Sequence, residues 1–567
     1  LEDAGYDPRT TFDRSRTSVI LGVTGALEMV VPLGARLGHP HWWRALRESG
    51  VDEETASEVV RKISSSYVSW QENSFPGLLG NVVAGRIANR LDLHGTNCVT
   101  DAACASSLAA LHLASLELHS GRSDMVVTGG VDTFNDIFMY MCFSKTPALS
   151  PTGDARPFDG QGDGTILGEG IGIVVLKRLD DAVRDGDRIY ARLLSIGTSS
   201  DGKGSAIYAP TVDGQQRALK DAYQQAAISP STIGLVEAHG TGTAVGDAIE
   251  LRALQEIYAR EGSSAHRCAL GSVKSQIGHT KAAAGAAGLI KAVLALHHKV
   301  QPPSIKIRQP LDTLRETGSP FHIEEVARPW VQHPDFPRRA AVSSFGFGGS
   351  NFHAVLEENS AGRIETDWND CALLFSFSAS HRDSLLQQLE HAVTEIQQLQ
   401  SSIEIDAVAR DSRARFKASD DHRISIVVGR SEDAASRLKS AVEAVQQEQD
   451  TRWSLPTGID RDHGPRRGSL AVIFPGQGSQ RVDMLRSTAC RFPEMIRVID
   501  EAERAFWNQQ EDSGLAARIW PPREWDDHST AQDEALRQTD VAQPALGAVS
   551  LGLYQVLGRF GIAGELF

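Results

Sequence analysis

The most informative stretch of the chain is Asp101-Ala102-Ala103-Cys104-Ala105-Ser106-Ser107. It follows a strand-like run, residues 97–101, and opens an apolar helical run, residues 105–120. A strand, a tight turn of small residues and a helix would place the Cys104 thiol at a helix N-terminus. The helix dipole and free N–H groups there are expected to lower the pKa of the thiol and to favour the nucleophilic thiolate. The alternative is a buried structural cysteine, since free cysteine is among the most buried residue types.

Outward from this run, residues 15–357 alternate strand-like and helix-like patterns. Strands are expected at residues 16–23, 125–130, 170–176, 233–237 and 339–344, and helices at residues 106–120, 215–227 and 281–298. Alternating strands and helices predict a layered α/β domain whose sheets are covered on both faces. An acid-rich stretch, residues 51–73, predicts a helical excursion on the surface.

The pattern changes after residue 359. A helix is expected at residues 384–400, a short strand at 424–428 and a second helix at 432–449, which together predict a small α/β domain over residues 360–468. Its last part, residues 450–468, is polar and contains proline and glycine, as is typical of a linker. A strand at 470–474 opens a third domain, residues 469–567. A purely structural interaction module stays open as an alternative for residues 360–468 only.

The charge and the cysteine pattern exclude several classes of protein. The chain of 567 residues has 57 Lys and Arg against 72 Asp and Glu, and a net charge of −15 disfavours general nucleic-acid binding. The six cysteines are scattered and form no C-x-x-C pair, so we expect neither a disulfide scaffold nor a zinc ribbon, and a reducing, cytoplasmic location. The most apolar stretch, residues 282–296, is too short for a bilayer and contains Lys291, so no membrane span is predicted.

A first candidate for acid–base chemistry is His239, in Glu237-Ala238-His239-Gly240-Thr241-Gly242-Thr243. It directly follows an expected strand, and loops at strand ends are where α/β folds place their chemistry. The glycines allow a ligand close to the backbone, and the hydroxyl groups of Thr241 and Thr243 can bind it. The pattern favours a functional histidine over a turn histidine with no role.

A second candidate is His279, which lies with Lys274 in Gly271-Ser272-Val273-Lys274-Ser275-Gln276-Ile277-Gly278-His279-Thr280. The helix that follows would hold the imidazole near its positive end and favour the neutral ring. Lys274 could reach the same cavity. The alternatives are a solvated surface lysine and a helix-capping histidine. Cys104 and the two histidines are too far apart in sequence for a local metal motif, so no metal is predicted.

The last motif is Ser343-Ser344-Phe345-Gly346-Phe347-Gly348-Gly349-Ser350-Asn351, which we interpret as too rich in glycine for a regular strand. Its amides could point at a developing oxyanion, and Phe347 could swing as a gate between its glycines. A β-bulge with a packed aromatic ring is the alternative.

Together these four motifs resemble the β-ketoacyl synthases, the condensing enzymes of fatty-acid and polyketide assembly. The resemblance covers nearly all of residues 1–357 and gives an expected ketosynthase domain of residues 1–359. It implies a thiolase-like fold of five αβαβα layers that forms a homodimer. It also implies decarboxylative Claisen condensation of a cysteine-bound acyl chain with a malonyl unit. Both groups would be carried on the phosphopantetheine of an acyl carrier protein, and no cofactor would be bound directly.

The resemblance also implies a role for each candidate residue. Cys104 would accept the acyl chain, while His239 and His279 would assist decarboxylation and stabilise the enolate. The backbone amides of Cys104 and Phe347 would form the oxyanion hole. Lys274 would orient the histidine site electrostatically, and Thr241 and Thr243 would hold the pantetheine arm.

Other stretches resemble large multidomain synthases of the polyunsaturated-fatty-acid type, and related polyketide synthases share much of the same sequence. The stretches are Glu72-Asn73-Ser74-Phe75-Pro76-Gly77, residues 80–90, Met139-Tyr140-Met141 and Ser144-Lys145-Thr146-Pro147. Phe474-Pro475-Gly476-Gln477-Gly478-Ser479-Gln480 resembles the start of a malonyl-type acyltransferase, in which Gln477 would help to form an oxyanion hole. Residues 360–468 would then link the ketosynthase to the acyltransferase, and reductase and dehydratase domains are implied as further partners.

Compared with the family pattern, the ketosynthase part is expected to lack residues at its N-terminal end. The acyltransferase part is expected to stop before its nucleophile, so acyltransferase activity is not expected. One alternative is a non-catalytic paralogue that dimerises or sets chain length, but such members lose the cysteine or a histidine. Another is a cysteine hydrolase, which leaves the paired histidines and the Phe347 loop unexplained.

Overall fold

The computed structural model describes residues 1–7, 9, 12–25, 34–133, 135–146, 148–204, 206–259, 268–316, 318–359, 372–399, 401–429, 432–447, 452–464, 468–507, 514–523 and 529–565. Pro147, Cys371 and the last two residues of the helix expected at 432–449 lie outside these ranges. The chain divides into two compact units: Leu1–Glu365 with Pro475–Val556, and Thr366–Phe474 with Leu557–Phe567. Within the described ranges, no helix is both long and apolar enough to span a bilayer.

The first sheet of the larger unit has the strand order β2-β1-β3-β4. Its strands are β1 (Thr17–Val23), β2 (Asn97–Thr100), β3 (Met125–Asp132) and β4 (Gly170–Leu176). The first three are parallel and β4 runs antiparallel to β3. Val19 and Leu21 pack with helix α5 (Asn81–Leu91), whereas Ile20 packs with helix α6 (Ser106–His119). The sheet is therefore covered on both faces, as the alternation of side chains along a strand requires.

The second sheet has the strand order β5-β12-β11-β6-β7-β9. Its strands are β5 (Ala191–Ser200), β6 (Leu235–Glu237), β7 (Cys268–Gly271), β9 (Phe321–His322), β11 (Arg339–Gly346) and β12 (Ser350–Glu358). Val236 and Val355 pack with α9 (Val212–Ala226) and α10 (Ala244–Tyr258). Leu235 and Leu356 pack on the opposite face with α6 and α12 (Ala284–His298).

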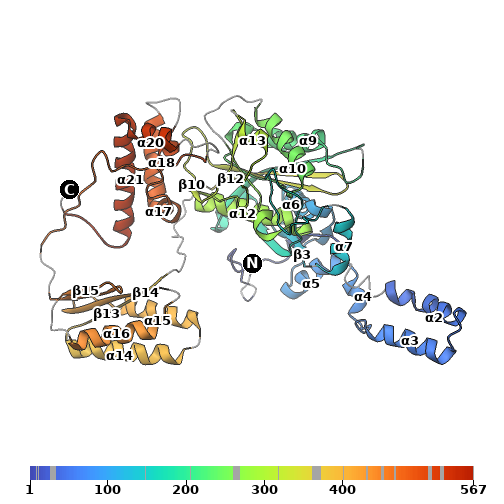
Figure 1. Cartoon of the computed structure of the whole chain (residues 1–567), viewed down its shortest axis with the longest axis horizontal. Helices are drawn as coiled ribbons and strands as arrows, with labels where there is room; N and C mark the ends of the chain where they lie inside the picture. Colours follow the sequence, from blue (N-terminus) through green and yellow to red (C-terminus); the bar gives the residue numbers. More distant parts are fainter. Residues whose placement is uncertain are drawn as a thin grey trace. The chain divides into compact units, whose positions relative to one another are not determined.

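Helices α6 and α12 thus lie between the two sheets, while α5 covers one outer face and α9 and α10 cover the other (Figure 1). This order confirms the five αβαβα layers. The strands and helices expected over residues 15–357 are all present, with ends shifted by a few residues. Shorter elements complete the unit: α4 (Ser74–Gly77), α7 (Ile137–Lys145), α8 (Leu179–Asp185), β8 (Val300–Gln301), β10 (Arg328–Pro329) and α13 (Asp312–Arg315).

The acid-rich stretch forms a helix, as predicted, but over a shorter range. Helix α3 (Glu53–Ser65) is capped at its N-terminus by Asp52, whose side chain accepts a hydrogen bond from the Thr55 N–H. It pairs with a helix that we did not anticipate, α2 (His39–Glu48), which has no buried residue. The two helices project from the unit (Figure 1).

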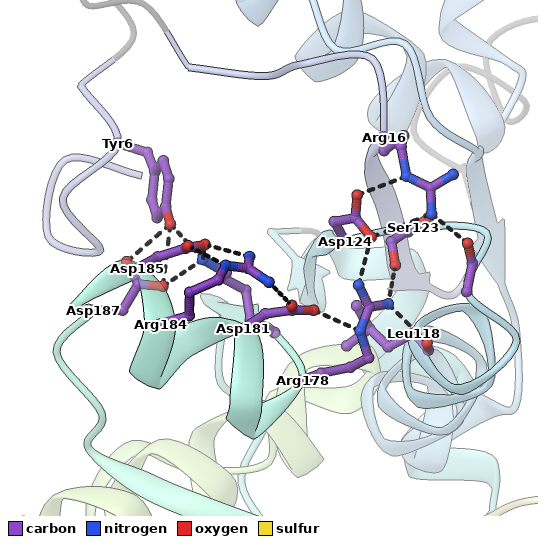
Figure 2. Close-up of polar contacts among 12 residues, drawn as sticks. Tyr6, Arg16, Leu118, Ser123, Asp124, Arg178, Asp181, Arg184, Asp185 and Asp187 are labelled. Carbon is purple, nitrogen blue, oxygen red and sulfur yellow. Dashed lines mark hydrogen bonds and ion pairs between the residues drawn. The ribbon is translucent and has the colours of Figure 1, made fainter.

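Ion pairs join the segments next to strands β1, β3 and β4 of the first sheet. Arg178, next to α8, binds the carboxylates of Asp124 and Asp181 and the carbonyl oxygens of Leu118 and Ser123 (Figure 2). Arg16 donates to Asp124 from the other side, and the two guanidinium groups lower the pKa of that carboxyl to about 2. Because these groups are partly exposed to solvent, their ion pairs align the neighbouring segments but contribute little to stability.

The smaller unit contains an antiparallel sheet with three helices on one face (Figure 1). The strands are β13 (Ala372–Ala379), β14 (His422–Gly429), β15 (Trp453–Leu455) and β16 (Ile459–His463), and the helices are α14 (Arg382–Gln398), α15 (Ser402–Arg415) and α16 (Ala434–Gln447). The strand and the two helices expected here are confirmed. Over its described residues 452–464, the linker expected at 450–468 is wrong, because β15 and β16 form a hairpin: Gly458 supplies the positive φ of its turn (+79°) and Ile459 is fully buried.

The strand expected at 470–474 is also wrong. Among the described residues no strand runs beside it, and Ile473 is 90% exposed. An apolar run needs a neighbouring strand to satisfy its N–H and C=O groups, so pattern alone does not make it a strand. The residues that follow are helical: α17 (Arg486–Arg491), α18 (Pro493–Trp507), α19 (Leu515–Ile519), α20 (Ser529–Arg537) and α21 (Thr539–Arg559).

A buried ion-pair cluster joins this helical region to the second sheet within the larger unit. Arg338, just before β11, binds both carboxylate oxygens of Asp500 in α18 at 2.6 and 2.7 Å, and binds Glu358 at 2.8 Å. One guanidinium nitrogen, Nη2, binds Asp500 and the other, Nη1, binds Glu358, so the two carboxylates together fix the orientation of the Arg338 side chain.

Candidate active site

Cys104 lies in a tight elbow between β2 and α6, in the short 3-10 turn η1 (Ala103–Ala105). The preceding residue, Ala103, has φ of +50°, a region that is unfavourable for a residue with a side chain. The Asp101 carboxylate accepts the Ala103 N–H at 2.9 Å, and the Ser106 hydroxyl accepts the Ala102 N–H at 2.8 Å. These bonds hold the strained turn, and the predicted position of Cys104 at the entrance to a helix is confirmed.

The expected lowering of the Cys104 pKa is wrong. The thiol is buried, and burial raises its pKa to about 11. The charge of Lys274 and the backbone N–H of Phe347 act in the opposite direction but do not offset the loss of solvation. The sequence could not predict this result, because it showed the helix start but not the surrounding protein that excludes water.

His239 follows β6 on a loop, as predicted. Its backbone N–H and that of Gly240 donate to the two carboxylate oxygens of Glu250, each at 2.7 Å. The Lys274 ammonium donates to the His239 carbonyl oxygen at 2.5 Å. Burial lowers the pKa of the imidazole well below its usual value, and the charge of Lys274 lowers it further. The Nδ1 atom of His239 is buried and has no hydrogen-bond partner among the described residues, so it is available to a substrate.

His279 precedes the turn η4 (Lys281–Ala283) that leads into α12, and its ring centroid is 5.5 Å from that of His239. Its Nδ1 accepts the backbone N–H of Lys281 at 3.0 Å. The neutral ring then carries its proton on Nε2. Burial, followed by the charges of Lys274 and Lys281, lowers the pKa of His279 well below its usual value. The direction agrees with the predicted neutral form, but its cause is burial rather than the helix end.

Lys274 begins the short helix α11 (Lys274–Ile277) and is buried, which contradicts the alternative of a solvated surface lysine. Burial lowers the pKa of its ammonium group, while the carboxylates of Glu237 and Glu250 oppose that change. Lys274 donates a hydrogen bond to the His239 backbone, and its positive charge also acts on the Cys104 thiol. One buried cation therefore acts on both the histidine loop and the thiol.

Phe347 lies at the turn between β11 and β12. Its backbone N–H is directed at the Cys104 thiol, and its ring is 48% exposed and stacks on Phe143 with centroids 6.5 Å apart. Our expectation that residues 343–351 cannot form a regular strand is wrong for most of the run. Strand β11 continues to Gly346 and β12 starts at Ser350, because only Gly348 and Gly349 have positive φ.

The hydroxyl groups of Thr241 and Thr243 lie 2.9 Å apart at the start of α10. The N–H groups of Thr241 and Gly242 donate to Asp247, whose carboxyl has its pKa raised to about 6 by burial. The pantetheine-binding role of the two threonines stays a prediction.

Gln477 lies in the expected acyltransferase motif, residues 474–480, and not among the residues around Cys104. Its side-chain amide donates to the Thr539 hydroxyl of α21 at 3.1 Å, and both residues are exposed. Its role in an acyltransferase oxyanion hole also stays a prediction.

Sequence reasoning missed the buried acidic residues that organise the site. Asp247 and Glu250 lie three residues apart on α10 and bind the N–H groups of the His239 loop. That spacing, two acids among the apolar residues on the buried face of the helix, was a signal that could have been used. The pair Asp132–Lys281 gave no such signal, because its members lie far apart in the sequence.

Three family matches cover most of the chain. Residues 1–182 match "Beta-ketoacyl synthase, N-terminal domain", residues 190–308 match "Beta-ketoacyl synthase, C-terminal domain" and residues 319–418 match "Ketoacyl-synthetase C-terminal extension". The chain is also similar to the ketosynthase from module 6 of the bacillaene synthase from Bacillus subtilis 168. The two share 30% sequence identity with a TM-score of 0.52, over 82% of this chain and 71% of that structure. The chain belongs to the β-ketoacyl synthase family.

Two curated relatives of this β-ketoacyl synthase represent the two expected types of multidomain synthase. One subunit of the polyunsaturated fatty acid synthase of Thraustochytrium sp. is 38% identical over 99% of the chain. A mycocerosic acid synthase-like polyketide synthase of Mycolicibacterium smegmatis is 35% identical over 86% of it. The chain spans about a fifth of the length of each, 21% and 22%. The resemblance to transferase-type condensing enzymes of multidomain synthases is confirmed.

The raised pKa of Cys104 predicts an unusual pH profile for alkylation of this synthase. Because only the thiolate reacts, the iodoacetamide rate should rise about tenfold per pH unit from pH 7 to 10. It should level off near pH 11, the pKa of Cys104, as followed by the mass of the Cys104 peptide. A small-molecule thiol, which levels off near about 8.5, is the reference. A plateau for Cys104 below pH 9 would contradict the structure, and Lys274→Met should slow the reaction further.

Gly346 is expected to tolerate no side chain. A Cβ there would lie 2.1 Å from the Ala102 carbonyl oxygen, so Gly346→Ala must push β11 away from the Cys104 elbow. We expect a loss of about 1–3 kcal/mol in the free energy of unfolding, measured by urea denaturation, together with slower acyl loading. Gly547→Ala in helix α21, where a Cβ meets nothing within 4 Å, is the matched control and should not be destabilising. Equal stability of the two variants would refute the close approach.

Proposed function

We propose that this β-ketoacyl synthase condenses an acyl chain held on Cys104 with a malonyl group, both supplied as thioesters of a carrier protein's phosphopantetheine. The observation that supports it is a single buried site. The Cys104 thiol lies at a helix entrance, where the Phe347 N–H is directed at it. The neutral rings of His239 and His279 lie together, and Lys274 binds the His239 backbone and acts electrostatically on the thiol. A non-catalytic paralogue is not favoured, because the cysteine and both histidines are present.

The loading step is a thioester exchange at Cys104. The sulfur attacks the acyl carbonyl carbon, the bond from that carbon to the pantetheine sulfur breaks, and the thiol proton ends on the released pantetheine thiol. The negative charge that develops on the carbonyl oxygen needs hydrogen-bond donors. The backbone N–H groups of Cys104 and Phe347 would supply them. The Phe347 N–H is already directed at the thiol, which supports this assignment.

The second step forms the carbon–carbon bond. The bond to the malonyl carboxylate breaks, CO₂ leaves, and its electron pair remains on an enolate. The enolate carbon attacks the acyl carbonyl carbon, the bond to Cys104 breaks, and the released thiolate takes up a proton from solvent. His279 carries its proton on Nε2 and can donate to the enolate oxygen, and neutral His239 can donate in the same way.

Carrier proteins and other synthase domains are the proposed partners, because the relatives are multidomain synthases. Thr241 and Thr243 would bind the pantetheine arm. Residues 1–359 would form the ketosynthase, residues 360–468 the linking domain and residues 469–567 the start of an acyltransferase in which Gln477 serves the oxyanion hole. We also propose a ketosynthase homodimer working in the cytoplasm.

The test uses the intact synthase. An acyl carrier thioester is added first, and the protein is weighed by mass spectrometry to detect an added acyl group. Malonyl carrier is added next, and the carrier is weighed to detect a β-ketoacyl product one two-carbon unit longer than the starting chain. Loading and extension together support the proposal. Loading without extension would reject condensation, and no loading on folded protein would favour the non-catalytic paralogue.

A further inference from the structure

Lys281 is a buried cation directly beside the candidate active site, two residues after His279. Its side chain is 6% exposed, and its Nζ lies 2.9 Å from Asp132, 2.6 Å from the Asn135 side-chain oxygen and 3.2 Å from the Gly168 carbonyl oxygen. Two of its three N–H groups donate to Asn135 and Gly168, and the ammonium forms an ion pair with the carboxylate of Asp132. The mechanism above uses neither Lys281 nor Asp132.

The backbone of Lys281 is strained. Its φ is +45°, where the Cβ of an ordinary residue crowds the backbone, and lysine has no local preference for that region. The conformation therefore needs support from elsewhere in the structure. The Asp132 carboxylate, from the end of β3, supplies it twice: it binds the Lys281 ammonium and accepts the N–H of Ala282 at 3.3 Å.

The strained backbone at Lys281 determines the tautomer and the orientation of the His279 ring. Lys281 directs its own backbone N–H at Nδ1 of His279, at 3.0 Å, which places the ring proton on Nε2. The nearby ammonium charge also lowers the pKa of His279, which favours the neutral ring. If the turn relaxed, Nδ1 would lose its donor and both the ring orientation and the tautomer would be free to change.

We propose that Lys281 and Asp132 are positioning residues for His279, and that their buried ion pair holds the turn whose backbone N–H fixes the donor tautomer of this histidine. The inference rests on the proposed role of His279 in decarboxylation. It predicts that breaking the pair impairs decarboxylation more than loading: the Cys104 elbow has its own hydrogen bonds, and the charges of Asp132 and Lys281 act on the thiol in opposite directions.

Asp132→Asn tests the proposal on the full chain. It keeps the shape of the side chain but leaves the Lys281 ammonium without its counter-charge. Conversion of malonyl carrier to acetyl carrier should fall by about tenfold to a hundredfold, since small displacements of a catalytic group are costly. Acyl loading at Cys104 should stay within about threefold of the parent rate. Lys281→Gln alone should lose decarboxylation to a similar extent as Asp132→Asn. The double variant, Asp132→Asn with Lys281→Gln, places two neutral amides opposite each other and should recover part of the decarboxylation rate.

Glu357→Gln is the matched control, because Glu357 forms a similarly buried ion pair with Arg339 at 2.8 Å, on the strand β12. It should lower the melting temperature without changing the ratio of decarboxylation to loading. Three results would overturn the inference: an Asp132→Asn variant with parental decarboxylation, equal losses in both steps, or a double variant that recovers nothing. His279→Ala is run in parallel. If His279→Ala decarboxylates malonyl carrier at the parent rate, the proposed role of His279 itself is wrong. If His279→Ala loses decarboxylation but Asp132→Asn does not, only the positioning role of Asp132 and Lys281 is wrong.

Discussion

Cys104→Ala is expected to abolish acyl loading. Alanine keeps the small side chain that the elbow tolerates but removes the sulfur atom at this site, so the proposed covalent intermediate cannot form. The measurement is intact-protein mass after incubation with an acyl carrier thioester: the parent protein should gain the mass of the acyl group and the variant should gain none. Because the parent reaction depends on this bond, the condensation rate should also fall to background.

The matched control for that variant is Cys142→Ala. Cys142 is an exposed free cysteine in α7, so it would be the first to react if any accessible thiol could take the acyl group. The control should load at the parent rate, and digestion should locate the acyl group on the peptide that contains Cys104. An acyl adduct that survives Cys104→Ala, or that disappears in Cys142→Ala, would show that Cys104 is not the acceptor.

The prediction of the fold succeeded where local pattern and tertiary environment agree. The continuous apolar runs of β1, β3 and β6 are buried by helices on both faces, so the strands follow from the composition of the runs. The prediction failed where pairing decides the outcome. Residues 453–463 are polar yet form a hairpin on the edge of an existing sheet, whereas the apolar residues 470–474 have no partner strand among the described residues.

The candidate site shows the same division. The small residues around Cys104 and the glycines after His239 are local features, and the structure places both residues as expected. The pKa of Cys104 depends instead on how much protein surrounds the thiol, which no local motif specifies. The contact between Asp132 and Lys281 joins the end of one strand to a distant helix entrance, so it could not be inferred before the layers were known.

Replacement of either histidine by alanine should separate the two half-reactions. His279→Ala and His239→Ala each remove a donor to the enolate oxygen, so malonyl decarboxylation should fall by about a hundredfold or more. Acyl loading at Cys104 should change far less, because the oxyanion donors of that step are backbone groups. Carrier mass spectrometry follows both steps, and His119→Ala, an exposed histidine at the end of α6, is the control.

The same pair of measurements distinguishes a histidine that donates a hydrogen bond to the enolate from one that accepts a hydrogen bond. With Nδ1 occupied by the Lys281 N–H, the neutral His279 ring can only donate from Nε2. His279→Gln, which places an amide N–H near that position, should therefore retain more decarboxylation than His279→Ala. Since burial holds the pKa of His279 well below its usual value, the decarboxylation rate should also show no inflection near pH 6.5 as the pH falls from 8 to 6. A rate that drops through that range as the ring protonates would instead mean that the folded protein lets water reach His279.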